Sequence, residues 1–175
     1  MAEVHLIGQI IGASGFPKQG LFCKWNIQTG GAWKLLQGAK EGQTQVDTPN
    51  IGETSYWSHP VDAHYATRGL QGWPKILVQV FHQDSLGRNS LAGYGFCHVP
   101  TSPGHHNLDI MTWRPAGSFR DTIVQHYLGG SHQLRNPELM VSSSDRHRLT
   151  TIAMGKVHIQ VGVIVRNFDK FGVEC

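Results

Sequence analysis

The segment 157–166 limits the fold more than any other part of the chain, because apolar side chains recur there at every second position. The alternating apolar residues are Val157, Ile159, Val161, Val163 and Val165. A helix would spread these side chains around its axis, whereas in a strand they all point to one face. β-Branched residues also favour the pleated surface of a sheet. The segment therefore predicts a β-strand with one buried face.

Further strands follow from similar patterns and from the turns between them. Residues 75–82 carry apolar side chains on both faces, which predicts a central strand. The other predicted strands cover 3–11, 21–28, 33–36, 55–66, 91–99, 106–112 and 148–153. Gly- and Pro-rich turns separate them, for example at Gly15-Phe16-Pro17 and Ser102-Pro103-Gly104. One domain over residues 1–175 is therefore expected, an all-β sandwich or barrel of about eight strands.

Residues 118–128 have a different pattern, which predicts one short helix at an edge or end of the sheets. Ser118 and Asp121 resemble a capping box, and Gly129-Gly130 provides the C-terminal stop. Apolar side chains recur between them at helical spacing: Phe119, Ile123 and Tyr127.

No set of histidines has the spacing of a metal site. His59 and His64, with Asp62 between them, could be ligands, but residues five apart on a strand point to opposite faces. The adjacent His105-His106 would also diverge, and neither pair has a third ligand at a recognisable spacing. No bound metal or cofactor is expected. A metal-dependent hydrolase that uses the histidines is the alternative, and it would require stoichiometric metal in the purified protein.

Nothing in the sequence has the spacing of a catalytic nucleophile either. Cys97 and His98 are neighbours on a predicted strand and would face opposite ways. No Gly-x-Ser-x-Gly elbow is present, and Gly93-Tyr94-Gly95 lacks the third glycine of a dinucleotide loop. The carboxylates are isolated in the sequence: Asp47, Glu53, Asp62, Asp84 and Asp109. We therefore expect a binding protein and not an enzyme.

The five Trp residues allow a structural and a functional interpretation, since Trp is also enriched at interface hot spots. Trp25, Trp33 and Trp57 lie in strand-like runs, which predicts that they belong to the core. Trp73 and Trp113 lie in turn-like settings, before a Pro or an Arg-Pro pair. The sequence leaves open whether these two fill loops or contact a partner.

The charge pattern indicates a mildly basic surface. The net charge is +3. Glu3 is the only acidic residue up to position 40, whereas four lysines lie in the same stretch: Lys18, Lys24, Lys34 and Lys40. These lysines are candidates for contact with acidic phospholipid, whereas a nucleic-acid footprint would need denser clustering. Three widely spaced Cys form no disulfide framework, and no signal peptide or transmembrane segment is apparent. A cytoplasmic location is expected.

The most specific segment covers residues 81–96. It reads Phe81-His82-Gln83-Asp84-Ser85-Leu86-Gly87-Arg88, and then Leu91-Ala92-Gly93-Tyr94-Gly95-Phe96. A strand is predicted to end near Asp84. The chain then turns through Gly87 and Arg88, and the next predicted strand contains the Gly-Tyr-Gly triplet. Further matching pieces are Gly8-Gln9-Ile10, Trp57-Ser58-His59-Pro60, Gly72-Trp73-Pro74, Trp113-Arg114-Pro115 and Arg166-Asn167-Phe168. This pattern resembles the B-nine domain family, a ciliary branch of the C2-like β-sandwiches, over essentially the whole chain. It is closest to the branch that is little more than the domain itself.

The resemblance implies a C2-like antiparallel β-sandwich and a non-enzymatic function. Members of the family are subunits of the tectonic-like, or Meckel-syndrome, complex at the ciliary transition zone and basal body. They assemble there with the two other B-nine proteins, with tectonics and with other membrane components, and support the diffusion barrier and ciliogenesis. The alternative is an autonomous, calcium-independent phospholipid-binding domain in membrane trafficking.

Comparison with calcium-binding C2 domains bears on the segment around Asp84. A Ca²⁺ site needs six to eight oxygen ligands, yet Leu86 stands where a second acid would help. We therefore expect a structural turn that can also serve as an interaction loop. Its residues are Asp84, Gly87, Arg88, Gly93, Tyr94 and Gly95.

Overall fold

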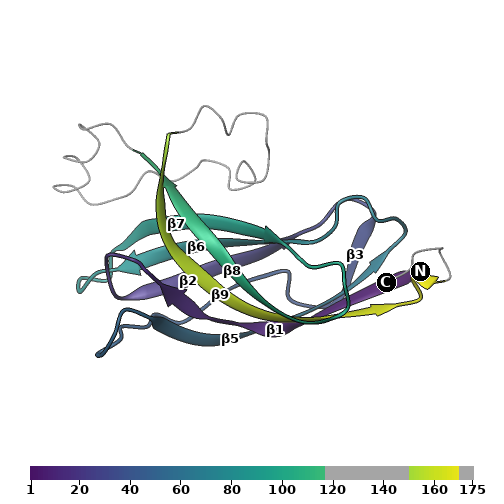
Figure 1. Ribbon diagram of the computed structural model, residues 1–175, viewed down its shortest axis with the longest axis horizontal. Coiled ribbons are helices and arrows are strands. Elements are labelled where there is room, and N and C mark those ends of the chain that lie inside the picture. Colours follow the sequence, from purple (N-terminus) through teal and green to yellow (C-terminus); the bar gives the residue numbers. More distant parts are fainter. Residues whose placement is uncertain (117–149, 170–175) are drawn as a thin grey trace.

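Nine β-strands make up the fold in the computed structural model, which describes residues 1–116 and 150–169 (Figure 1). They are β1 (Ala2–Ser14), β2 (Leu21–Gln28), β3 (Trp33–Gly38), β4 (Glu41–Gln43), β5 (Ser55–Thr67), β6 (Lys75–Gln83), β7 (Asn89–His98), β8 (Gly104–Pro115) and β9 (Thr151–Arg166). Each strand pair is antiparallel. The all-β prediction is confirmed, while the helix expected at 118–128 lies outside the described residues.

The strands form one sheet that folds over on itself, in the order β3-β5-β1-β9-β8-β7-β6-β2-β4. Within the described part of the chain, β7 and β8 pair only at Tyr94 and Trp113. The sheet separates into two layers at this weak junction: β3-β5-β1-β9-β8, and β7-β6-β2-β4. Figure 1 shows β8 and β9 crossing obliquely in front of the layer that contains β6 and β7. As predicted, β6 is a central strand.

The main core lies between the two layers and is built from the alternating apolar side chains. Val157, Ile159, Val161 and Val163 of β9 are buried, as the period-two pattern predicted. Trp25, Trp33 and Trp57 are buried as well, which confirms their assignment to the core. Trp73 fills a loop at one end of the core. Its Nε1–H donates to the carbonyl oxygen of Val99 at 2.8 Å, and its ring packs edge-on against Trp33 at 5.3 Å.

A second apolar cluster lies on the other face of the β2-β6-β7 layer. Phe22 and Phe81 alternate with the core residues Cys23 and Val80, so they point away from the main core. The buried members are Phe22, Leu77, Phe81, Leu91 and Tyr94, with Phe96 and Trp113 packed against them. Trp113 therefore contributes to packing in this cluster.

Two details of the predicted strands are wrong. The segments 148–153 and 157–166 were expected to be separate, yet β9 is continuous through Gly155. A Cβ atom there would lie 2.3 Å from the Ser14 carbonyl oxygen and 2.4 Å from the Phe16 ring. Gly155 therefore permits a close approach inside a strand and does not mark a turn. The three-residue β4 was missed because Glu41-Gly42-Gln43 is too short to show a period.

Candidate functional site

The family-signature turn connects β6 to β7, and Asp84 holds it together. Asp84 Oδ1 accepts the backbone N–H groups of Leu86 and Arg88 at 3.0 and 2.8 Å. Its Oδ2 accepts Arg88 Nε–H at 2.7 Å. Gly87 takes a φ of 76°, in the left-handed region that favours glycine, and its N–H donates to the Asp84 carbonyl. The side chain of Asp84 thus organises its own turn, as Asp commonly does.

These bonds also decide the ionisation of Asp84. Its pKa is lowered, first by the backbone N–H of Arg88 and then by the side chain of Arg88, because both stabilise the carboxylate form. Each oxygen of the Asp84 carboxylate already accepts a hydrogen bond, and the Arg88 guanidinium lies beside this carboxylate. The arrangement suits a fixed loop better than a Ca²⁺ ligand.

The glycines of the Gly93-Tyr94-Gly95 triplet allow β8 to pack closely against β7. A Cβ at Gly93 would lie 3.0 Å from Thr112 Oγ1, and one at Gly95 would lie 2.7 Å from Ile110 Cγ2. Tyr94 is buried on the opposite face, with its ring 5.7 Å from that of Trp113. This half of the signature therefore belongs to the packing of the layers.

The four candidate lysines lie on different parts of the molecule. Lys24 is exposed on β2, with its Nζ 5.2 Å from the centre of the Phe81 ring. Lys34 is exposed on β3, which belongs to the other layer. Lys18 lies in the β1–β2 loop, and Lys40 lies in the turn between β3 and β4.

The histidines whose sequence positions made them candidate ligands do not converge. The ring of His59 lies 6.0 Å from that of Trp25, whereas His64 Nε2 lies 3.3 Å from Glu3 Oε2 on the outer face of β5. His106 Nε2 contacts the Ser102 carbonyl oxygen at 2.9 Å. Within residues 1–116 and 150–169, no group of three or more His, Cys, Asp or Glu is arranged to hold a metal ion.

The cysteine beside His98 is a packing residue. Cys97 packs against the main core, and burial raises the pKa of its thiol to about 12. The thiol is therefore protonated at physiological pH, and a protonated thiol is a poor nucleophile.

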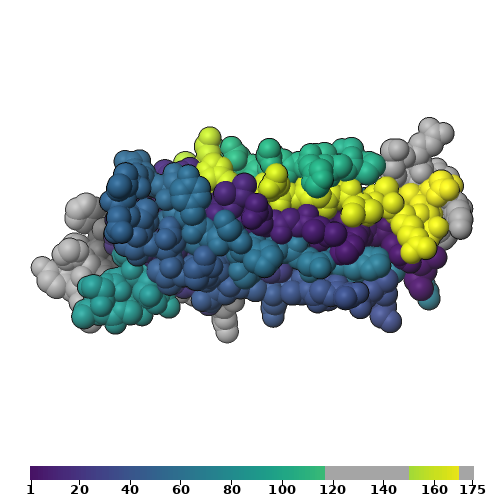
Figure 2. Space-filling view, turned by 90° about the horizontal axis from the view of Figure 1, so that it is seen from below, coloured from purple at the N-terminus to yellow at the C-terminus, as the bar shows by residue number. Residues whose placement is uncertain are grey.

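The outer face of the five-stranded layer carries polar pairs that the sequence did not reveal. Figure 2 shows part of this face, where β9 and β1 lie side by side as a yellow and a purple band. His5 Nε2 lies 2.7 Å from Asp62 Oδ1, and the rings of His5 and His64 are stacked with their centres 5.0 Å apart. Asp62 is therefore not isolated in the structure, because strand pairing places it close to His5.

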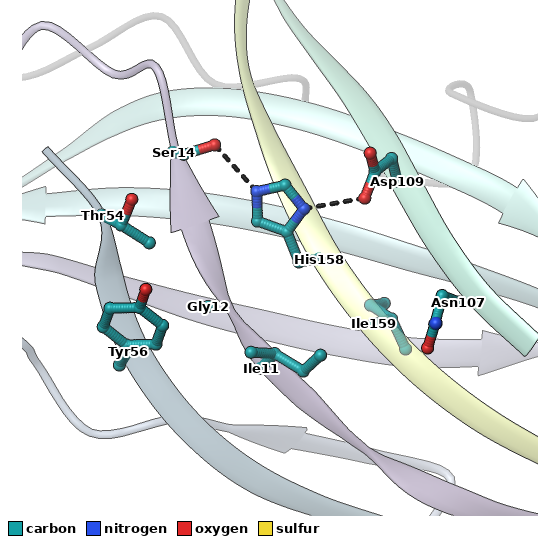
Figure 3. A pocket seen from close by; sticks show the side chains of 9 residues that line it. All are labelled: Ile11, Gly12, Ser14, Thr54, Tyr56, Asn107, Asp109, His158 and Ile159. Atoms are coloured by element: carbon teal, nitrogen blue, oxygen red, sulfur yellow. Dashed lines mark hydrogen bonds and ion pairs between the residues drawn. The ribbon is translucent and has the colours of Figure 1, made fainter.

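A hollow of about 350 Å³ opens on the same face (Figure 3). Three of its residues form a chain of hydrogen bonds across three strands. Nδ1 of His158 in β9 is hydrogen-bonded to Asp109 Oδ1 of β8 at 2.7 Å. Nε2 of the same ring is hydrogen-bonded to Ser14 Oγ of β1 at 2.8 Å. The remaining lining residues are Ile11, Gly12, Thr54, Tyr56, Asn107 and Ile159. Asp109 is isolated in the sequence, and the strand register brings it opposite His158.

The fold and these sites define a class of protein. The described residues form an antiparallel β-sandwich, and the matching family model over residues 4–164 is B9-C2, "Ciliary basal body-associated, B9 protein". The class is thus a C2-like β-sandwich, as predicted. The chain belongs to the B9, or B-nine, domain family, which is not a known enzyme family.

Similar proteins cover the whole chain. It is 61% identical to B9 domain-containing protein 2 of Homo sapiens, over 100% of both chains, and 41% identical to that of Drosophila melanogaster, over 99% of both. It is 27% identical to B9 domain-containing protein 1 of Xenopus laevis, over 97% of this chain and 87% of that protein. Among solved structures it is similar to the C2A domain of plant Extended Synaptotagmin 1, with 12% identity, a TM-score of 0.46 and 93% coverage of each chain.

The described residues include no helix of the length and apolarity needed to cross a membrane.

Proposed function

We propose that this protein is a non-enzymatic scaffold subunit of the tectonic-like, or Meckel-syndrome, complex at the ciliary transition zone. In this proposal it assembles with the two other B9 domain proteins, and the assembly contacts tectonics and other membrane components. It thereby supports the diffusion barrier and ciliogenesis. Membership of a ciliary basal body-associated family over residues 4–164 carries the proposal.

The outer face of β1 and β9 offers a surface for such assembly. Ile7 is 44% exposed and Ile164 is 54% exposed. Ile164 pairs with His5 across the two strands, so Ile7 and Ile164 are diagonal neighbours on one face. Exposed apolar side chains that adjoin each other are typical of protein interfaces. We propose this pair as the centre of the contact with a related B9 domain, and the signature turn around Asp84 as a second contact.

Co-purification with the two related B9 domains tests this proposal. The double variant Ile7→Lys/Ile164→Lys should weaken complex formation by about tenfold or more, since each buried Ile side chain contributes roughly 1.5–3 kcal/mol. Ile51→Lys is the matched control, because Ile51 is 94% exposed in a loop and should tolerate the change. Separate migration of the three wild-type proteins at micromolar concentration would contradict assembly itself. An equal effect of the control would contradict only the assignment of the surface.

The alternative is a calcium-independent phospholipid-binding domain that acts alone. The four lysines are exposed but lie on different parts of the molecule, so each one that reaches an acidic membrane would add about 1 kcal/mol. Vesicles that contain phosphatidylserine should then bind the isolated protein, and binding should weaken with salt and in a variant with Gln at Lys18, Lys24, Lys34 and Lys40. Strong flotation without any partner protein would favour this function over the scaffold.

A further inference from the structure

The hydrogen-bond chain in the hollow assigns a different task to each of its three side chains. The Asp109 carboxylate can only accept, so it takes the proton on His158 Nδ1. A neutral imidazole carries one ring proton, which leaves Nε2 of His158 as an acceptor. Ser14 Oγ–H must then donate to Nε2, at 2.8 Å. Hydroxyl, imidazole and carboxylate are thus connected in the order that activates a serine nucleophile.

The local backbone presents Ser14 to the hollow. Ser14 is the last residue of β1, and Gly15 follows with a φ of 74°, so the chain turns directly after it. The register of β1 shifts between Ile10 and Gly12 in its pairing with both β5 and β9. Such bulges re-aim side chains and are enriched next to functional sites. Gly12 lines the hollow without filling it, and Figure 3 shows Ser14, His158 and Asp109 in a row across three strands.

We propose that Ser14 is a reactive serine that accepts an acyl group from an activated ester, either a thioester or an aryl ester. Ser14 Oγ attacks the carbonyl carbon while His158 Nε2 takes the hydroxyl proton. The new Oγ–C bond forms, the bond from carbon to the leaving group breaks, and His158 returns the proton to the departing thiolate or phenolate. The products are an O-acyl serine and a free thiol or phenol, so the step needs no further reactant.

The exposure of the site to water limits how strongly Asp109 can assist the acyl transfer. The side chain of His158 is 30% exposed and that of Asp109 is 59% exposed. Water weakens the electrostatic contribution of Asp109 in such a setting. We therefore assign His158 as the base, Asp109 as a positioning residue, and the reaction as a single acyl transfer onto the protein. This modification site is independent of the proposed assembly function.

Labelling with a fluorophosphonate probe and with p-nitrophenyl acetate tests the proposal, with intact mass and peptide mapping as readouts. Ser14 should react about 10²-fold faster than Ser85, an exposed serine in the β6–β7 turn, because a positioned base contributes this much or more. Ser14→Ala should lose the label, and His158→Gln should slow it by about 10²-fold. Asp109→Asn should slow it less, with part of the rate recovered in Asp109→Glu.

Control variants separate activation from a purely structural role. His5→Gln removes a histidine of the same face that also contacts a carboxylate, and it should label like wild type. Ser14→Cys keeps a nucleophile beside His158 and should react with iodoacetamide faster than the same variant that also carries His158→Gln. Thermal unfolding should show that each variant is folded. Labelling of Ser14 at the rate of Ser85, or labelling unaffected by His158→Gln, would overturn the proposal and leave a hydrogen-bond chain that only joins strands.

Discussion

At the scale of the residue, Asp84 organises the β6–β7 turn through its own side chain. Its two oxygens accept three hydrogen bonds within five residues, and Gly87 supplies the backbone conformation that the turn requires. The lowered pKa of Asp84 reflects the same bonds, since they stabilise the carboxylate more than the acid. The turn should therefore depend on pH through this group.

Asp84→Asn tests this dependence on pH. Because the pKa of Asp84 is lowered in the folded state, its contribution to stability is present above the unfolded pKa, near 3.9, and is lost as pH falls through the folded value. The stability difference between wild type and Asp84→Asn should be constant above about pH 5 and should shrink below pH 4. Urea unfolding at a series of pH values measures it, with Glu53→Gln as a control at another exposed carboxyl. A difference that is independent of pH would contradict the role of the carboxylate.

At the scale of the elements, the junction between β7 and β8 is the point where the sheet becomes two layers. Only Tyr94 and Trp113 pair across it in the part of the chain that the structure describes. The glycines of β7 bring Ile110 and Thr112 of β8 close to the strand backbone. Van der Waals packing should therefore carry much of the stability at this junction.

Gly95→Ala tests this packing. The added methyl group would lie 2.7 Å from Ile110 Cγ2 and 3.1 Å from the Met111 carbonyl oxygen, so a neighbour must move. We expect a loss of about 1–3 kcal/mol in the free energy of unfolding. Gly31→Ala is the matched control, because a Cβ at Gly31 has no neighbour within 4 Å, and it should change stability by less than about 0.5 kcal/mol. Equal effects of both changes in urea unfolding would refute the packing role.

Trp73 connects the loop before β6 to Val99, the residue after β7, through its Nε1–H. Trp73→Phe keeps an aromatic ring but leaves the Val99 carbonyl oxygen without this donor, and it should cost about 1–2 kcal/mol. Trp73→Ala should cost more, because the contacts with Trp33 and Phe168 are also lost. Thermal and urea unfolding measure both variants. A Phe variant as stable as wild type would show that the hydrogen bond contributes nothing.

At the scale of the whole molecule, the two layers enclose a core that buries Cys23 fully and Cys97 in part. Burial raises the pKa of Cys23 and of Cys97 to about 12. A thiol with a raised pKa supports the folded state fully below its unfolded pKa, near 8.5, and this support is lost as pH rises toward the folded value. Exposure of the Cys23 thiol therefore reports opening of the whole sandwich.

Thiol labelling at pH 8 tests the burial of these cysteines. Native Cys23 should react at least about 10²-fold more slowly than in urea, because its thiolate fraction is lower and a fully buried thiol is closed to the reagent. Native Cys97 is only partly buried, so its reaction should be slowed less. Peptide mapping resolves each cysteine. Rapid reaction of Cys23 in the native protein would contradict its burial, whereas slow reaction of Cys23 in the double variant Ile7→Lys/Ile164→Lys would show that the surface change leaves the core closed.

The sequence by itself determined the strands other than β4, the burial of Trp25, Trp33, Trp57 and one face of β9, and the family. Alternating side chains specify a strand and its buried face locally, so β2, β6 and β9 could be predicted from their own residues. The turn at Asp84 could also be predicted, because its partners lie within five residues. Strand register and bulges decided the rest, since they set which side chains meet across a sheet. His5 with Asp62, and Ser14 with His158 and Asp109, are separated by up to 144 residues and become neighbours only when β1, β5, β8 and β9 pair.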